Sequence, residues 1–386
     1  MRLSPAARIG GAGMLALVVT YGIGRQAYGL FVPTFRQEFG LSLDVLGFYA
    51  SAAQAGYLVA AVVTAVVTAR LGQAVPVVSG CLVLAVGAAM TATAPGPALL
   101  AVGTTAAGTS AGGSWAPFSD VVEARVPPSG RRRALALVNA GSPVGLVVAS
   151  MLVLVAGDRW RAVWWVFAAI GLVAAAVARK VLADGPPRPA GNRSRPRTRW
   201  FLNARSARLL VVTSGLSITS GAYFAYAPDT ARDAGLAAWS GPAMWAVLGT
   251  AGAVVGVFAS AFADRYGLRA PLAVTLLLVG GSTLVLLVAP GSLIAALGSA
   301  ALFGVGFTTG FALVVMWSQQ VFDDRPTTGF TLAIVFVGAG FVVGPSLFGV
   351  LATRIDRPVA LLATAAPALL VALVPPASRD RADARA

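Results

Sequence analysis

One arginine stands inside the first long apolar segment of the chain, where a permanent charge is costly. The segment reads YGIGRQAYG, and Arg25 lies about 9 Å from the end of an apolar run that closes near Phe31. Its planar guanidinium offers five N–H donors, a geometry that suits a carboxylate or a phosphate. Tyr21 and Tyr28 are four and three residues away and are expected on the same helical face. These side chains predict a binding site.

Two interpretations of Arg25 stay open. Its long side chain can extend along the apolar surface to the lipid headgroups, as arginines near the ends of membrane helices do. Alternatively, it faces the protein interior and binds an anionic group, which is the interpretation we favour. The glycines at 22, 24 and 29 are expected to leave room beside it. Hydroxyl groups on the same face are more typical of a lined pocket than of a lipid-facing surface.

The element that carries Arg25 is one of twelve predicted membrane spans. Of the 386 residues, 57% are hydrophobic and 11% are charged, whereas soluble domains carry about a quarter charged residues. The apolar runs are about 20 residues long, the length that a helix needs to cross about 30 Å of hydrocarbon. We expect an all-α membrane protein whose spans are 9–31, 43–68, 74–93, 97–119, 133–156, 160–183, 207–228, 238–262, 270–289, 292–319, 328–352 and 357–376.

The basic residues set the expected orientation. Of the 29 lysines and arginines, 22 fall on the side of the N-terminus, six fall on the other side, and Arg25 lies within a span. Cytoplasmic loops of membrane proteins carry such an excess, so both termini are expected in the cytoplasm of a bacterial cell, with the spans in its inner membrane. This topology explains the net charge of +15, which therefore does not indicate nucleic-acid binding.

A Pro-, Arg- and Ser-rich segment at 184–206 divides the chain into two sets of six spans. We expect residues 1–183 to form an N-terminal six-helix bundle and residues 207–386 to form a C-terminal six-helix bundle with a short cytoplasmic tail. The segment between them is predicted to be a flexible, extended cytoplasmic linker. Its basic residues and those that flank it are expected to attract anionic lipid headgroups.

The two halves of the chain resemble each other. At an offset of 195 residues the matching positions are Ile23 with Ile218, Tyr28 with Tyr223, Pro33 with Pro228, Arg70 with Arg265, and Gly72 with Gly267. Matches in the same order and at one offset predict an internal repeat. Two such halves joined by a cytoplasmic linker are the parallel-repeat arrangement of transporters that rock about a central site.

The loop SAFADRYGLRA at 260–270 makes a family resemblance specific. It is similar to the signature loop of the major facilitator superfamily, Gly-x-x-x-Asp-Arg-x-Gly-x-Arg, and the chain resembles that superfamily over nearly its whole length. The matching residues are Asp264, Arg265, Gly267 and Arg269, and Ser260 stands where glycine is usual. The copy in the first half, TARLGQ, keeps Arg70 and Gly72 but has Ala69 at the aspartate position.

The resemblance implies a fold of two pseudo-symmetric six-helix bundles and a cytoplasmic gate at these loops. Gly267 permits a tight turn, and Asp264 and Arg265 are expected to pair with helix ends across the two halves. Because Ala69 replaces the aspartate, the gate of the first half is expected to be weaker or asymmetric. The pattern around YGIGR also resembles the YbfB/YjiJ-like bacterial branch of the superfamily, with Gln26 where that branch tends to carry phenylalanine.

Acidic residues fall in loops, tails or the edges of spans, and none of the fourteen lies near a helix centre. Asp229, just after the predicted span 207–228, is the best candidate for binding a coupling ion, although a solvated loop carboxylate is the more ordinary interpretation. The chain has no histidine and one cysteine, Cys81. Without an intramembrane carboxylate pair, a histidine or a metal-binding spacing, we expect no enzyme activity, no metal and no cofactor.

Further polar and aromatic residues at membrane depth are candidates for a substrate pocket. They are Trp115, Asn139, Tyr223, Tyr226 and Trp317. Packing or an interfacial position is the alternative for each tryptophan, and helix-to-helix hydrogen bonding is the alternative for the asparagine. In the second half Ser220 occupies the position that corresponds to Arg25. Only the first half would therefore supply a charged side chain to the substrate. Trp160, Trp164 and Trp165 predict an aromatic belt at the outer membrane surface.

The sequence thus predicts a monomeric secondary transporter that moves a small organic solute with an anionic group by alternating access. An exporter of hydrophobic, drug-like compounds is the first alternative, since most of the expected pocket is apolar and aromatic. A non-transporting membrane receptor or assembly partner is a second alternative, but the loops offer no sensing domain. The small-molecule substrate, the lipid bilayer and a coupling ion are the expected partners.

Overall fold

Helices account for almost all of the described chain, and no strand occurs in it. This computed structural model describes residues 4–183, 204–256, 258, 262, 265–322 and 326–374. The elements of the first half are α1 (Pro5–Leu17), η1 (Val18–Gln26), α2 (Tyr28–Phe39), α3 (Leu43–Leu71), α4 (Ala74–Ala92), α5 (Pro97–Thr109), η2 (Ser110–Gly113), α6 (Trp115–Arg125), α7 (Pro128–Ala156) and α8 (Trp160–Leu182). The elements of the second half are α9 (Ala204–Asp233), α10 (Ser240–Gly256), α12 (Arg269–Val288), α13 (Leu293–Val321), α14 (Pro326–Arg354) and α15 (Arg357–Val371).

Nine helical segments of the described chain are long and apolar enough to cross a membrane. The other three predicted spans are shorter or broken helices. The span at 97–119 is divided into α5, η2 and α6 at a glycine-rich stretch, where helix propensity is weak. The spans at 238–262 and 357–376 correspond to α10, with 17 residues, and α15, with 15 residues. The all-helical membrane fold is confirmed, whereas the count of twelve stays a prediction.

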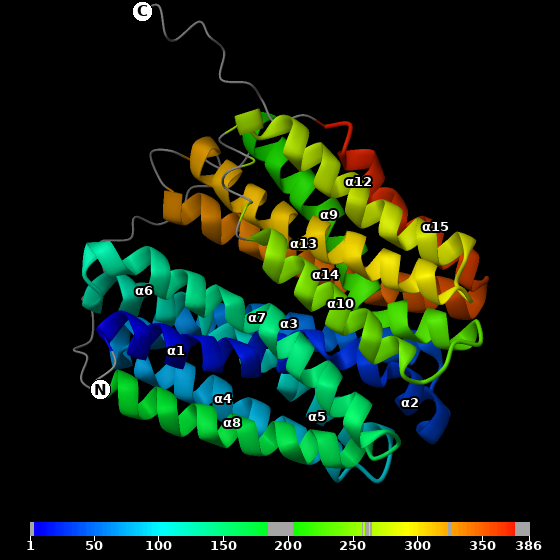
Figure 1. Ribbon diagram of the computed structural model, residues 1–386, viewed down its shortest axis with the longest axis horizontal. Helices are drawn as coiled ribbons and strands as arrows, with labels where there is room; N and C mark the ends of the chain where they lie inside the picture. Colours follow the sequence, from blue (N-terminus) through cyan, green and yellow to red (C-terminus); the bar gives the residue numbers. More distant parts are fainter. Residues whose placement is uncertain are drawn as a thin grey trace, which may run out of the picture.

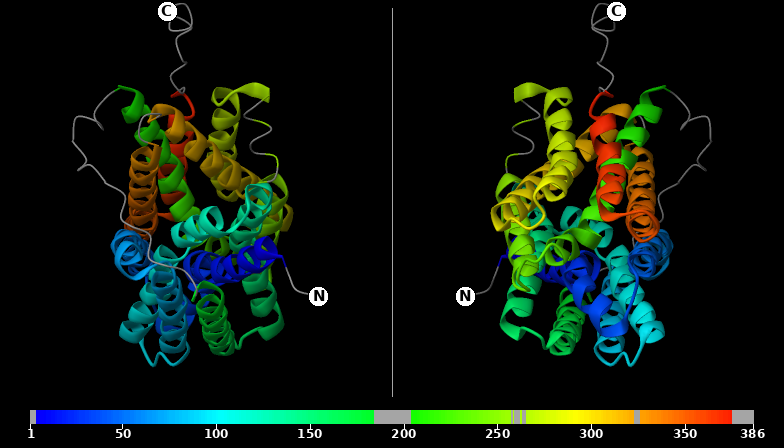
Figure 2. Two further views of the ribbon diagram at one scale, coloured as in Figure 1. Left: turned by 90° about the vertical axis from the view of Figure 1, so that its left-hand side faces the viewer. Right: turned by 90° about the vertical axis from the view of Figure 1, so that its right-hand side faces the viewer.

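The helices lie in two groups. In Figure 1 the elements α1–α8 occupy the lower part of the molecule and α9–α15 the upper part. Figure 2 shows the same two groups from their ends, with blue to green helices in one and green to red helices in the other. The predicted linker lies outside the described residues up to 203, and α9 begins at Ala204. We call the groups the first and second bundles, and the predicted boundaries between them stay predictions.

The bundles have two distinct ends. At one, which we call the linker end, α8 finishes and α9 begins; at the other, the Arg36 end, α2 and α9 finish and α15 begins. The bundles meet where α3 packs along α14, α7 packs along α10 and α2 packs against α9. In Figure 1 the ribbons are close together near α2 and α10 and separate toward the N-terminus.

Hydrogen bonds between the bundles also lie toward the Arg36 end. The contacts are Tyr226 Oη to the Leu43 carbonyl (2.6 Å), the Asp44 N–H to Thr353 Oγ1 (3.2 Å), Ser51 Oγ to the Val342 carbonyl (2.6 Å) and Trp245 Nε1 to the Gln26 carbonyl (3.1 Å). On α3 these contacts involve only the first turns of a helix that continues to Leu71. The described residues therefore connect the bundles at one end and not evenly along their length.

Aromatic side chains fill the first bundle near α2 and α8. The ring of Trp164 lies 5.0 Å from that of Phe31 and is 1% exposed, and Trp160 Nε1 donates to Glu38 Oε2 at 2.6 Å. The predicted aromatic belt is therefore wrong for these two tryptophans, because they face neighbouring helices. Trp165, which is 51% exposed, alone among the three has the exposure that a belt requires.

Glycine at position 29 permits the close contact between α2 and α9. A Cβ atom there would collide with the carbonyl oxygen of Phe224, whereas a Cβ atom at Gly11 on α1 would meet nothing within 4 Å. The backbone of α9 cannot move away without opening the Arg36 end. The absence of a side chain at Gly29 therefore helps the bundles to close at this end.

We predict that Gly29→Ala lowers the midpoint of thermal unfolding in detergent, whereas Gly11→Ala does not. Alanine improves helix propensity at both sites, so the difference isolates the collision, and overpacking of this kind costs about 1–3 kcal/mol. Equal midpoints for the two variants would show that the α2–α9 contact is looser than described.

Candidate binding site and gate between the bundles

Arg25 lies in η1, a nine-residue π-helical segment that interrupts the first span. Such segments are rare and are found often at functional sites. The glycines around Arg25 serve helix contacts in this segment. A Cβ atom at Gly22 would lie 2.5 Å from Gly145 Cα of α7, and one at Gly24 would lie 2.6 Å from the Ala107 carbonyl oxygen of α5. The expectation that these glycines leave room beside Arg25 is wrong, because neighbouring backbones occupy that room.

The guanidinium of Arg25 is surrounded by protein groups from three elements. Its Nε donates to Gln54 Oε1 at 2.9 Å, and its Cζ lies 4.4 Å from the ring centroid of Tyr57, both on α3. The ring centroid of Phe341 on α14 is 4.6 Å from Cζ, and that of Tyr21 is 5.9 Å away. We call these five residues the Arg25 cluster. Since Phe341 belongs to the second bundle, the side chain points to the contact between the bundles and does not extend along the lipid-facing surface.

One donor group of Arg25 is left without a partner. Nη2 is buried and makes no hydrogen bond to any described residue. A buried charged donor that lacks an acceptor carries a large desolvation cost, which an anionic acceptor would offset. The faces of the guanidinium lie near aromatic rings and its Nε donates to Gln54, so the Nη edge is the part of the group that is left for an anionic acceptor.

Tyr28 does not join this cluster. Its hydroxyl donates to the Leu46 carbonyl at 2.9 Å, and its ring packs near Phe35. The π-helical segment ends at Gln26, and its wider turn changes the direction of the residues that follow it. The prediction that Tyr28 shares a face with Arg25 is therefore wrong, whereas the prediction for Tyr21 is confirmed by its ring contact.

The other predicted pocket residues lie in separate places. Tyr223 contacts Ser299 (2.8 Å between the hydroxyl oxygens) and stacks on Phe303 inside the second bundle. Trp115 Nε1 donates to Asn139 Oδ1 at 2.9 Å, so these two residues form a pair between α6 and α7. Trp317 is buried in α13. A substrate role for each of them stays a prediction.

Aromatic rings of the second bundle continue from Phe341. Its ring centroid lies 6.3 Å from that of Phe224, 6.4 Å from that of Phe307 and 6.2 Å from that of Phe311. The ring of Phe307 also packs on Phe303 at 5.6 Å. The surface that faces Arg25 from the second bundle is therefore aromatic, and it carries none of the carboxylates within the described residues.

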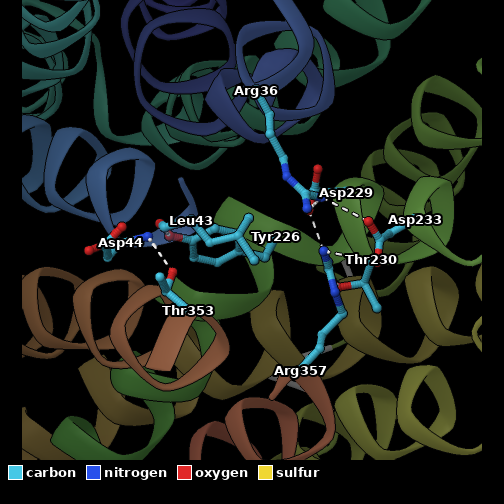
Figure 3. Close-up of polar contacts among 9 residues, drawn as sticks. All are labelled: Arg36, Leu43, Asp44, Tyr226, Asp229, Thr230, Asp233, Thr353 and Arg357. Carbon is cyan, nitrogen blue, oxygen red and sulfur yellow. Dashed lines mark hydrogen bonds and ion pairs between the residues drawn. The ribbon is translucent and has the colours of Figure 1, made fainter. Parts of the chain in front are cut away.

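Four charged side chains join the bundles at the Arg36 end (Figure 3). Arg36 Nη1 of α2 lies 2.8 Å from Asp233 Oδ1 and 3.6 Å from Asp229 Oδ2, both on α9. Arg357 of α15 lies 2.9 Å from Asp229 Oδ2 and 3.3 Å from Asp233 Oδ2. We call this group the Arg36 cluster. Two cations and two anions balance, and Arg36 is the one member from the first bundle.

Helix dipoles explain why these charges depend on the opposite charges of the cluster for stabilisation. Asp229 and Asp233 lie in the last turns of α9, where the helix carbonyls disfavour negative charge, and Arg357 begins α15, where the amide groups disfavour positive charge. Burial by itself disfavours the charged form of Arg36, but the hydrogen bond to Asp233 and the charges of Asp229 and Asp233 raise the pKa of Arg36 above its usual value. The guanidinium therefore stays charged throughout the physiological range.

Asp229 is 2% exposed and lies inside α9. The interpretation of this residue as a solvated loop carboxylate is therefore wrong: α9 continues through Pro228 to Asp233, one turn beyond the predicted span. Tyr226, three residues earlier, hydrogen-bonds across to Leu43 (Figure 3). A predicted substrate residue and a predicted coupling residue thus both lie at the contact between the bundles.

Comparison with protein families identifies the chain. The model of the major facilitator superfamily matches residues 14–345. The chain belongs to the major facilitator superfamily. It is accordingly a multi-pass membrane transporter and not an enzyme. No curated protein sequence matches the chain.

Solved structures of transporters share this fold at low sequence identity. A bacterial homologue of the human lysosomal transporter Spinster, in an inward-facing and unoccupied conformation, is 14% identical with a TM-score of 0.77, and the match covers 97% of each chain. The inward-facing and occupied form is 13% identical with a TM-score of 0.74, over 96% of this chain and 95% of that chain. A variant of the nucleoside transporter NupG is 11% identical with a TM-score of 0.78, over 96% and 98%.

The superfamily loops at the linker end show the expected turns. Gly72 and Gly267 have φ values of 81° and 69°, a left-handed conformation that favours glycine. Arg70 is exposed in the last turn of α3, Arg265 lies 5.5 Å from the ring of Tyr266, and Arg269 is the exposed first residue of α12. Asp264 lies outside the described residues. The gating role of these residues stays a prediction.

Sequence reasoning missed Gln54, Tyr57 and Phe341 of the Arg25 cluster, and it assigned no role to Arg36 or Arg357. A signal existed for two of these residues. Gln54 and Tyr57 are three residues apart inside an otherwise apolar span, so they share a helical face. Asp229 and Asp233 are likewise four residues apart. Nothing local indicates that Phe341 or Arg36 contacts a residue of the other half.

We predict that Arg36→Gln separates the bundles at the Arg36 end. Spin labels on Gln37→Cys and Ala237→Cys, two exposed positions beside α2 and α9, would report the distance by pulsed electron paramagnetic resonance. The buried Cys81 would be replaced by alanine. We expect a longer distance population in the variant, because the glutamine cannot replace a charge shared by two carboxylates.

Arg161→Gln is the matched control for this measurement. Arg161 pairs with Glu38 at 2.6 Å at the same end, but both residues belong to the first bundle. This change should leave the distance unaltered. An equal response of the two variants would mean that the Arg36 cluster does not hold the bundles together.

Proposed function

We propose that the protein is a secondary transporter of a small organic anion in a bacterial inner membrane, and that the solute binds to Arg25 between the bundles. The single observation that carries this proposal is the buried, unpartnered Nη2 of Arg25 beside the second bundle. A solute that accepts from Nη2 while packing on Phe341 would contact both bundles at once. Contact with both bundles is what a transporter needs if its solute is to favour their movement.

The surroundings of Arg25 favour an anion with an apolar or aromatic body. The Arg25 cluster contains three aromatic rings and one amide, and Phe341 continues into the rings of Phe224, Phe307 and Phe311. A carboxylate or phosphate would pair with the guanidinium, and the rest of the solute would displace water from the rings. Tyr21 and Tyr57 would add hydroxyl groups, whose oxygens lie 3.5 Å apart.

The contacts at the Arg36 end support a mechanism of alternating access. We assign the linker end to the cytoplasm from the distribution of basic residues, so the Arg36 cluster is the outer gate and is closed here. Opening would require Arg36 to leave both carboxylates. The coupling role proposed for Asp229 fits this gate, since a proton or cation bound at Asp229 or Asp233 would weaken the hold on Arg36 and favour opening.

A second candidate function has one observation in its favour. The aromatic surface around Phe341 would also accept hydrophobic, drug-like compounds, including cations that stack on aromatic rings. Such an exporter would have no need of the unpartnered donor on Arg25. The two candidates therefore differ in the sign of charge that the site prefers. A nucleoside, the solute named for one structural neighbour, offers a neutral comparison.

Thermal stabilisation of the purified protein tests the proposal. We expect the unfolding midpoint to rise with benzoate or phenyl phosphate and to stay constant with uridine or tetraphenylphosphonium. Arg25→Gln should abolish the rise, and Arg25→Lys should reduce it, because lysine keeps the charge but loses the planar pair of donors. Uptake of the stabilising anion into proteoliposomes should fall in the same order.

Arg8→Gln is the matched control, because it removes an exposed arginine from the same span without changing the site. If anions stabilise the Arg25→Gln variant as well as the original protein, the role of Arg25 is wrong. Stabilisation by tetraphenylphosphonium alone would favour the exporter.

A further inference from the structure

A groove runs along the surface of the first bundle between α4 and α8. It has a volume of about 520 Å³ and is lined by Val78 and Leu82 of α4, by Leu172, Ala175, Ala176, Arg179 and Lys180 of α8, and by Ala183. In Figure 1 these two helices form the lower edge of the molecule, on the side away from the second bundle. The groove is therefore separate from the Arg25 and Arg36 clusters.

Most of the groove is lined by apolar side chains, as the binding of an acyl chain requires. Alanines 175 and 176 leave a hollow, while Leu82 and Leu172 stand beside it and are 41% and 56% exposed. A second hollow beside Arg269 on α12 has a similar apolar and basic lining but a volume of only about 60 Å³. Of the two, only the α4–α8 groove is large enough for a lipid chain.

Both cations of the groove lie at its linker end. Arg179 and Lys180 are exposed residues in the last turn of α8. They are not needed to cap this helix, because Arg125 donates to the carbonyls of Val181 and Leu182, each at 3.4 Å. Among the described residues no carboxylate lies within ion-pair distance of either cation. Two donors are thus available beside an apolar groove, at the end of the bundle that we assign to the cytoplasm.

We propose that this groove binds one phospholipid with a net negative headgroup, whose acyl chain lies against Leu82 and Leu172 and whose phosphate pairs with Arg179 and Lys180. Apolar contact alone would accept any phospholipid. The two cations select a headgroup with uncompensated negative charge, because a zwitterionic lipid neutralises its phosphate with its own ammonium group. Attraction of basic side chains to anionic lipid is a general feature of the cytoplasmic surface, and this groove would confine it to one site.

Native mass spectrometry of the delipidated, full-length protein tests this site with phosphatidylglycerol and phosphatidylcholine as probes. We expect one phosphatidylglycerol molecule to bind in preference to phosphatidylcholine. The double variant Arg179→Gln/Lys180→Gln should bind phosphatidylglycerol roughly 30-fold more weakly and lose the preference, as expected for two basic side chains at a membrane surface. Ala176→Trp, which fills the groove but keeps both cations, should also remove the bound lipid.

Arg132→Gln/Arg133→Gln is the matched control, because it removes two exposed cations of α7 near the same end of the first bundle. Its phosphatidylglycerol binding should be unchanged. Equal loss in the two double variants would overturn the site in favour of diffuse attraction by surface charge. Equal binding of the two lipids by the original protein, or unchanged binding by Ala176→Trp, would overturn it as well.

Discussion

The ion pairs of Arg36 are the interaction on which the arrangement of the two bundles depends. Asp229 is buried, and a buried carboxylate must be paired or lose its charge. One of its partners, Arg357, moves with the same bundle, but the other comes from α2 across the contact. The hydrogen bonds of Tyr226, Asp44 and Ser51 lie toward the same end. With the bundles closed at the Arg36 end, the Arg25 cluster is the next contact between them in the direction of the linker end.

Two arginines, Arg25 in the first span and Arg36 beyond it on α2, illustrate opposite uses of a cation. Arg36 finds two carboxylates of the protein and serves a contact between helices. Arg25 finds an amide oxygen and three aromatic rings, and one of its donors has no partner among the described residues. A cation that is satisfied by its own chain stabilises one conformation. A cation that is not satisfied by its own chain can respond to a solute, which is why we assign recognition to Arg25 and gating to Arg36.

Composition and periodicity were sufficient for the fold but not for the side-chain contacts of the site. Apolar length predicts membrane helices, and the loop with Arg265 and Gly267 identifies the superfamily, because both signals are local. Tyr28 was placed wrongly because a π-helical segment changes the turn, and the sequence does not reveal where a helix widens. Asp229 was placed in a loop because it follows the predicted apolar span 207–228, whereas α9 continues to Asp233. Contacts such as that of Arg36 with Asp233 join residues nearly 200 positions apart, and no pattern within either helix encodes them.

The central claim is that the region beside Arg25 is reached from one membrane face at a time, under the control of the Arg36 cluster. Its most direct test is the reactivity of Ser142→Cys toward a membrane-impermeant maleimide in right-side-out and inverted vesicles, with Cys81 replaced by alanine. Ser142 is a partly exposed residue of α7 whose hydroxyl donates to Gln26 Oε1, next to Arg25. We predict modification from the cytoplasmic face only, and from both faces once Arg36→Gln is added. Modification from both faces without that change, or from the cytoplasmic face alone in its presence, would contradict the account.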